Sequence, residues 1–178
     1  MNKACIEGVI VVEGKSDVSY LSSLIESNFF ITNGYDLNEE KIDFLKRASE
    51  VNRIIILTDN DDAGRQIENK LKSKISGSFA VKSEKITKKN SKKSGVAETD
   101  KKEILRVLSP FITPMNKEVR KPSYNLASII SLSDNPAEIR KQIINDYRLI
   151  DGNNNFLEQQ LRILKIDELE FKQKYGNK

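Results

Sequence analysis

Three carboxylates stand within four positions of the chain, directly after an apolar run. The run Ile54–Leu57 is followed closely by Asp59, Asp61 and Asp62. A short apolar run bounded by turn formers is typical of a buried parallel strand. Alternate side chains of an extended segment share a face, so we expect Asp59 and Asp61 to point the same way. Like charges at ~4 Å repel by ~4 kcal/mol at an effective dielectric of 20. The pair therefore favours a hard divalent cation with oxygen ligands, Mg²⁺ before others.

A further acid follows the first apolar run of the chain. Ile6–Val12 ends at Glu13 and Gly14, and a Ser or Asp helix cap follows, which predicts a strand–loop–helix junction. Glu13 is a candidate metal ligand, or a general acid or base if the other carboxylates raise its pKa. Lys15 and Arg65 flank the acids and are candidates for holding phosphate oxygens. Asp62, as the first residue of the next helix, is interpreted as a helix cap.

Strand-like and helix-like segments alternate through the first half of the chain. Apolar residues at helical spacing follow three of the four expected strands, which are Ile6–Val12, Phe29–Thr32, Ile54–Leu57 and Ser78–Val81. This β-α-β-α-β-α-β pattern predicts an α/β fold with a mainly parallel four-stranded sheet flanked by helices. Functional groups gather beyond the carboxyl ends of such strands. We therefore expect Glu13, Asp59 and Asp61 to converge on one edge of the sheet.

Positive charge is concentrated in one middle segment. Residues 81–122 hold 12 Lys/Arg against 5 Asp/Glu, net +7, whereas residues 1–50 have a net charge of −4. A Ser/Asn-rich stretch over 82–95 contains Lys88, Lys89, Lys92 and Lys93. We interpret it as a phosphate-gripping loop beside the acids, with a solvated surface loop as the alternative.

The chain changes character after this basic stretch. A helix capped by Thr99 or Asp100 completes an expected catalytic domain over residues 1–108. Three prolines then predict a linker over 109–121. The apolar spacing beyond it predicts a small all-α domain over 122–178, in which Asp134 caps a helix that has Pro136 in its first turn.

Composition excludes several classes of protein. The chain has no His and one Cys, Cys5, which excludes Ser-His-Asp triads, disulfide frameworks and multi-Cys zinc sites. No apolar run approaches the length of a membrane span, and we expect a cytoplasmic protein. Aromatic residues make up 7% with no Trp, which argues against a stacking platform for single strands.

The motifs VIVVEGKSD (9–17) and IIILTDNDDAGR (54–65) together resemble the Toprim domain of primases, topoisomerases and several nucleases. Within that group the chain most resembles the ribonuclease M-five family, which matures 5S ribosomal RNA. Three further stretches carry this narrower likeness: ITNG (31–34), KKSGVAETDKKEIL (92–105), and the C-terminal run with Tyr147, Asp151-Gly152-Asn153 and QLRILKI (160–166).

The resemblance implies a Mg²⁺-dependent endoribonuclease, with Mn²⁺ as a possible substitute, that cuts both strands of a 5S rRNA precursor helix. It implies a large-subunit ribosomal protein that holds the RNA, and a C-terminal domain that contacts RNA. We expect the protein to be monomeric on its own and to have no membrane partner. By position, the resemblance makes Glu13, Asp59 and Asp61 the catalytic and metal-binding acids. It gives Gly14 and Gly64 the role of allowing close backbone approach.

Two departures from the family pattern concern the site. Asn60 stands where a Pro is common, and Ala97 stands where the family has a Glu, so that Glu98 is the possible third acid. Two alternatives remain open. One is a Toprim protein acting on DNA, although 178 residues leave little room for a topoisomerase tyrosine domain and primase-type zinc cysteines are absent. The other is a non-catalytic RNA-binding assembly factor, which only the Ala97 departure favours.

Overall fold

The computed structural model describes residues 3–34, 37–81, 95–113 and 122–176. The chain divides into two compact units, residues 1–117 and residues 118–178, and each is described by itself. Within the four described ranges, no helix has the length and apolar character needed to cross a membrane.

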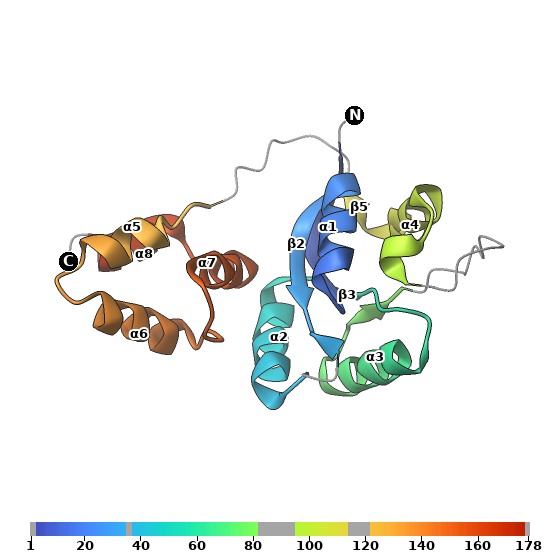
Figure 1. Ribbon diagram of the computed structural model, residues 1–178, viewed down its shortest axis with the longest axis horizontal. Coiled ribbons are helices and arrows are strands. Elements are labelled where there is room, and N and C mark those ends of the chain that lie inside the picture. Colours follow the sequence, from blue (N-terminus) through green and yellow to red (C-terminus); the bar gives the residue numbers. More distant parts are fainter. Residues whose placement is uncertain (1–2, 35–36, 82–94, 114–121, 177–178) are drawn as a thin grey trace. The chain divides into compact units, whose positions relative to one another are not determined.

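Unit 1 is built on a mainly parallel sheet, as the sequence predicts (Figure 1). Strands β1 (Ala4–Val12), β2 (Ile25–Ile31), β3 (Ile54–Ile56) and β4 (Phe79–Ala80) lie in the order β2-β1-β3-β4 and run parallel. Val9 of β1 pairs with Ile54 of β3, and Val11 pairs with Ile56. This register brings the carboxyl ends of two central strands to the same level, where the acids Glu13 and Asp59 follow.

A fifth strand joins the sheet in a segment that the sequence assigns to the linker. Residues 109–113 form the 3₁₀ turn η3 (Ser109–Phe111) and the strand β5 (Ile112–Thr113). β5 pairs antiparallel with β1, Thr113 opposite Cys5 and Ile112 opposite Ile6. β3 pairs with β1 only from Val9 onward, so the first half of β1 has an open edge for β5. The expected linker is therefore wrong over 109–113, and residues 114–121 lie outside the described ranges.

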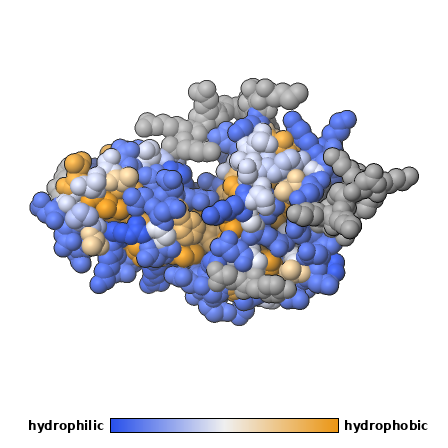
Figure 2. Space-filling model, in the orientation of Figure 1, coloured by the Kyte–Doolittle hydropathy of each residue, from blue (hydrophilic) through white to orange (hydrophobic). Residues whose placement is uncertain are grey.

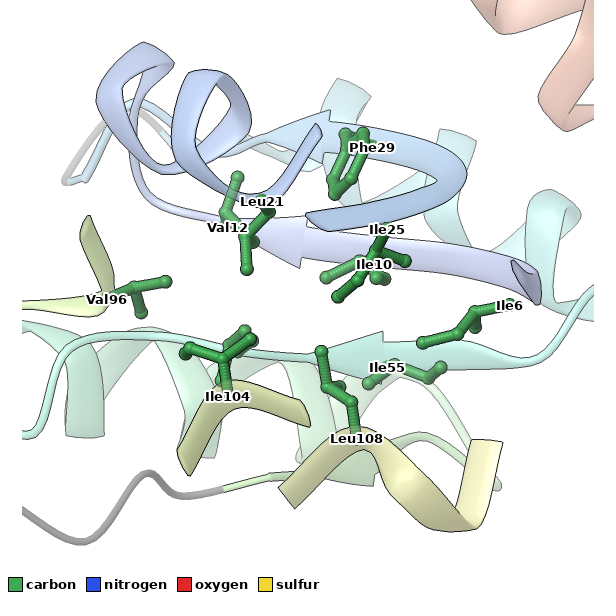
Figure 3. Close-up of a cluster of buried hydrophobic side chains, with 11 residues drawn as sticks. Ile6, Ile10, Val12, Leu21, Ile25, Phe29, Ile55, Val96, Ile104 and Leu108 are labelled. Atoms are coloured by element: carbon green, nitrogen blue, oxygen red, sulfur yellow. The ribbon is translucent and has the colours of Figure 1, made fainter. Parts of the chain in front are cut away.

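Helices cover both faces of the sheet (Figure 1). On one face, α1 (Lys15–Leu24) and α4 (Lys101–Leu108) bury Leu21, Ile104 and Leu108 against alternate residues of the strands (Figure 3). On the other, the Phe44 ring of α2 (Glu39–Val51) stacks on Phe30 of β2 at 5.3 Å between centroids. Each fully buried Leu or Ile stabilises the fold by ~1.5–3 kcal/mol relative to exposure. Burial of side chains on both faces of the sheet therefore fixes where each strand ends.

The boundary between α1 and β2 differs from the expectation. The sequence predicts that the second strand starts at Phe29. In the structure α1 ends at Leu24, and β2 begins at Ile25, which pairs with Ala4. Ile is β-branched and fits a pleated, buried surface, and Ile25 is 1% exposed.

The secondary structure that the structure describes in unit 2, over residues 122–176, is helical: α5 (Leu126–Leu132), α6 (Pro136–Tyr147), α7 (Asn154–Ile163) and α8 (Glu168–Tyr175). Its core contains Tyr124, whose hydroxyl donates to the Ile166 carbonyl at 2.7 Å. The N-cap of α6 is Asn135, which accepts from the Glu138 amide, and the assignment of Asp134 as the cap is wrong by one residue. The faces drawn in Figure 2 are largely hydrophilic, with apolar side chains in scattered groups.

Candidate active site

Glu13 and Asp59 meet at the carboxyl edge of the sheet. Glu13 directly follows β1, and Asp59 comes three residues after the end of β3. The Asp59 amide donates a hydrogen bond of 2.7 Å to Glu13 Oε1. The ladder continues beyond β3, since the Leu57 amide donates to the Val11 carbonyl at 2.9 Å. The parallel register of two strands therefore brings together two acids that lie 46 positions apart in the sequence.

Asp61 begins the next helix, α3 (Asp62–Lys74), as its N-cap. Its Oδ1 accepts from the Gly64 amide at 2.8 Å, and this satisfies one of the free amides at the start of the helix. The interpretation of Asp62 as the cap is therefore wrong. Asp62 is the first helical residue, and its exposed side chain is ion-paired with Arg65 one turn later. A carboxylate accepts several hydrogen bonds, so the capping role leaves Asp61 able to bind a cation.

Gly64 allows the start of α3 to lie against both acids. A Cβ at this position would lie 2.1 Å from the Asp59 carbonyl oxygen and 2.8 Å from Glu13 Oε1, closer than a real Cβ approaches a non-bonded atom. The Gly64 carbonyl in turn accepts from the buried Thr58 hydroxyl at 3.2 Å. Gly14 is different, because a Cβ there would meet only ordinary contacts at 3.7 Å. Close approach at Gly14 would thus have to be to a substrate, and it stays a prediction.

A turn far along the chain brings a further acid to the same edge. Gly95 precedes the 3₁₀ turn η2 (Val96–Glu98), and the Val96 amide donates to Asp59 Oδ1 at 2.7 Å. A Cβ on Gly95 would lie 2.7 Å from Glu98 Oε2 and 3.0 Å from Asp59 Oδ2. The two carboxylates therefore flank the same small residue. Glu98, the possible third acid, lies beside Asp59, although one residue later than the family pattern places an acid.

Asp17 is a site residue that the sequence reasoning missed. It is 5% exposed, and its Oδ2 accepts from the Gly14 amide at 2.9 Å. Burial raises the pKa of Asp17, and the charges of Asp59 and Glu98 raise it further. An acid in the first turn of a helix is usually a cap, so the position of Asp17 in the sequence did not mark it as a site residue.

The site carries excess negative charge. The pKa of Glu13 is raised chiefly by burial, and also by the charges of Asp59, Asp61 and Asp17. The pKa of Asp59 is raised by burial and by the charges of Asp61 and Glu98. Amides of Asp59 and Val96 act in the opposite direction, each favouring the ionised form of the acid it binds. The charged groups that raise these two pKa values, Asp17, Asp59, Asp61 and Glu98, are carboxylates, and such a cluster attracts a cation.

The donor set fits Mg²⁺ bound partly by substrate. All five acids offer oxygen, the donor that Mg²⁺ prefers. In the part of the chain that the structure describes, no three acidic, Cys or His side chains are arranged as a ready-made metal cage. Mg²⁺ is usually held by one or two carboxylates together with substrate phosphates and water, so an open arrangement suits it. The residues that would hold it are Glu13, Asp59 and Asp61, with Glu98 adjacent.

The structure describes two of the six basic residues that are expected to hold phosphate. Lys15 is exposed at the first position of α1, directly after Glu13-Gly14. Arg65 is exposed on α3, where it pairs with Asp62. Lys88, Lys89, Lys92 and Lys93 lie outside the described residues, so their role stays a prediction.

Comparison with known proteins gives the family. The Toprim domain model matches residues 8–93, which contain Glu13, Asp59 and Asp61. Ribonuclease M5 of Borreliella burgdorferi is 31% identical over 170 residues, covering 94% of this chain and 92% of that protein. The chain belongs to the ribonuclease M5 family. Ribonuclease M5 of Mycoplasma genitalium is 28% identical over 165 residues, covering 90% of each chain.

Membership of the ribonuclease M5 family makes the chain a Toprim-type ribonuclease, as the resemblance implied. A solved small Toprim domain protein from Bacillus stearothermophilus is 20% identical, with a TM-score of 0.48. That comparison covers 60% of this chain and 90% of the solved chain.

Proposed function

We propose that this ribonuclease is a Mg²⁺-dependent endonuclease that cleaves a double-stranded region of the 5S rRNA precursor in the cytoplasm. The observation that carries the proposal is the cluster of mutually repelling carboxylates at the carboxyl edge of the sheet. Family membership supports ribosomal RNA as the substrate class. A large-subunit ribosomal protein bound to the RNA is the proposed partner.

The bound ion would neutralise charge on the scissile phosphate and position a water for attack. Asp59 has Oδ1 occupied by the Val96 amide, which leaves Oδ2 available to the ion. Glu13 has Oε1 occupied by the Asp59 amide. Its Oε2 is available either to bind the ion or to accept the proton of the attacking water. Lys15 would contact phosphate oxygens as a flexible point charge, and Arg65 could do so after exchanging its partner Asp62.

The position of Glu98 bears on the non-catalytic alternative. That alternative rested on Ala97, which stands where the family has an acid. Because the Glu98 carboxylate lies beside Asp59, the site keeps an acid in this region. Several carboxylates gathered at one edge repel phosphate, so they would weaken binding in a protein that only binds RNA.

The test is cleavage of end-labelled 5S precursor with Mg²⁺ by the wild type, Asp59→Asn and Asp61→Asn. We expect both variants to bind the RNA in gel shifts and to cut it at least ~100-fold more slowly, because each replaces a charged carboxylate ligand of the ion by a neutral amide. Asp43→Asn is the matched control, because Asp43 is an exposed acid of α2 paired with Lys46. It should cut like the wild type.

Undiminished cutting by both site variants would overturn the metal-site assignment. A wild type that binds the precursor but does not cut it would favour the non-catalytic assembly factor. Faster cutting of a DNA duplex of the same sequence would favour the DNA-acting alternative.

A further inference from the structure

The turn that carries Glu98 is held together by its own backbone. The Glu98 amide donates to the Gly95 carbonyl at 3.2 Å, and the Thr99 amide donates to the Val96 carbonyl at 3.2 Å. The Thr99 hydroxyl also donates to the Gly95 carbonyl, at 2.9 Å. The Val96 side chain is 1% exposed and belongs to the core under α1 and α4 (Figure 3). These hydrogen bonds and the buried Val96 side chain hold Gly95–Thr99 in one conformation.

Helix α1 contacts this turn through two side chains on one face. Asp17 and Tyr20 lie three positions apart, so they are neighbours on the helix surface. The Ala97 amide lies close enough to Asp17 to favour the ionised form and so to lower its pKa, opposing the effect of burial. The Tyr20 hydroxyl donates to the Thr99 carbonyl at 2.6 Å, a hydrogen bond that joins residues 79 positions apart. The Tyr20 ring packs on the same core as Val96.

The Glu98 side chain itself is exposed. The place of its carboxylate beside Asp59 is therefore set mainly by the backbone of the turn. At one end the turn is tied to the site by the hydrogen bond from Val96 to Asp59, and at the other it is tied to α1 by the bond from Tyr20 to Thr99. Since α1 begins two residues after Glu13, it links the first acid of the site to the last.

We propose that Tyr20 is a positioning residue whose hydroxyl, through the Thr99 carbonyl, holds the Gly95–Thr99 turn so that Glu98 stays beside Asp59. The proposal rests on the proposed function only in taking Glu98 as part of the cation-binding site. Tyr20 does not itself touch the acids. Loss of its hydroxyl frees one end of the turn while the buried Val96 side chain still holds the other.

The test compares Tyr20→Phe with a matched loss of a hydroxyl, Tyr124→Phe. Tyr124 also donates from its hydroxyl to a backbone carbonyl, that of Ile166, but in unit 2. Two properties of the free protein are measured under native conditions: amide hydrogen exchange at Val96 and Ala97, and Mn²⁺ affinity by calorimetry. For Tyr20→Phe we expect ~5-fold faster exchange and ~3- to 10-fold weaker Mn²⁺ binding, the size of effect that one hydrogen bond gives. For Tyr124→Phe we expect neither.

The proposal would be overturned if the amides of Val96 and Ala97 exchanged at the wild-type rate in Tyr20→Phe, or if Tyr124→Phe raised their exchange rate equally. The Tyr20 hydroxyl would then have only a general stabilising role. Faster exchange with unchanged Mn²⁺ affinity would also overturn it, because the turn would then not position a cation ligand. Absence of Mn²⁺ binding by the wild type counts instead against the proposed function. The two failures are thus distinguishable, because exchange is measured without metal or RNA.

Discussion

Replacing Gly64 by Ala tests the packing of the site most sharply, because helix propensity and close packing predict changes in folding stability of opposite sign. Gly64 is the third residue of α3, and in an open helical position Gly→Ala would stabilise the protein by ~0.5–1 kcal/mol. Here the new Cβ would lie 2.1 Å from the Asp59 carbonyl oxygen, and ordinary contact begins at 3.4 Å. The two atoms must therefore separate by about 1.3 Å.

Overpacking of this kind costs ~1–3 kcal/mol, which outweighs the gain in helix propensity. We expect Gly64→Ala to be destabilised by ~1–2 kcal/mol in urea unfolding followed by circular dichroism. Because Asp59 moves with its own carbonyl, cleavage should fall by ~100-fold, the usual cost of a displacement of ~1 Å at a reacting centre.

Ala63→Gly is the matched control, because it makes the opposite change at the neighbouring helical position. It should be destabilised by ~0.5–1 kcal/mol through propensity alone and should cut at the wild-type rate. A Gly64→Ala variant that is more stable than the wild type, or that cuts normally, would refute the close packing of α3 against Glu13 and Asp59.

Three further predictions follow from the charges and the cap. Because the pKa of Glu13 is raised in the fold, the metal-free protein should lose stability as the pH rises from about 4.5 through that raised pKa. Glu13→Gln should therefore unfold at a higher temperature than the metal-free wild type at pH 7, but not below pH 4.5, while cutting poorly. Asp61→Ala should lose ~1 kcal/mol of stability with the cap, measured by urea unfolding, whereas Asp61→Asn should keep it. Replacing Lys88, Lys89, Lys92 and Lys93 by Ser should flatten the dependence of RNA affinity on salt; an unchanged slope would make that stretch a solvated surface loop.

The sequence was informative where periodicity and parallel topology act together. The β-branched run Ile54–Leu57 and the earlier run to Val12 predict neighbouring strands, and the structure joins Asp59 to Glu13 by a hydrogen bond at their ends. That prediction needed only the rule that parallel strands end at a common edge.

The features that the sequence does not predict are those whose local pattern is ambiguous or that depend on tertiary packing. Three acids within four positions all suit the start of a helix, and only the backbone geometry makes Asp61 the cap rather than Asp62. Ile112 and Thr113, between two prolines, read as a linker, and they form a strand because β1 has an open edge opposite them. The tie between Tyr20 and Thr99 depends on tertiary packing over 79 positions, which no local pattern encodes.

The central claim, that these carboxylates form one cation site, is tested most directly by titrating the isotopically labelled free protein with Mn²⁺ and recording paramagnetic broadening of its amide signals. We predict that substoichiometric Mn²⁺ broadens the signals of Asp59, Gly64 and Val96 first, since these amides bind the site carboxylates, and that Asp59→Asn largely abolishes the effect. Broadening that begins elsewhere in the chain, or that persists unchanged in Asp59→Asn, would contradict the account.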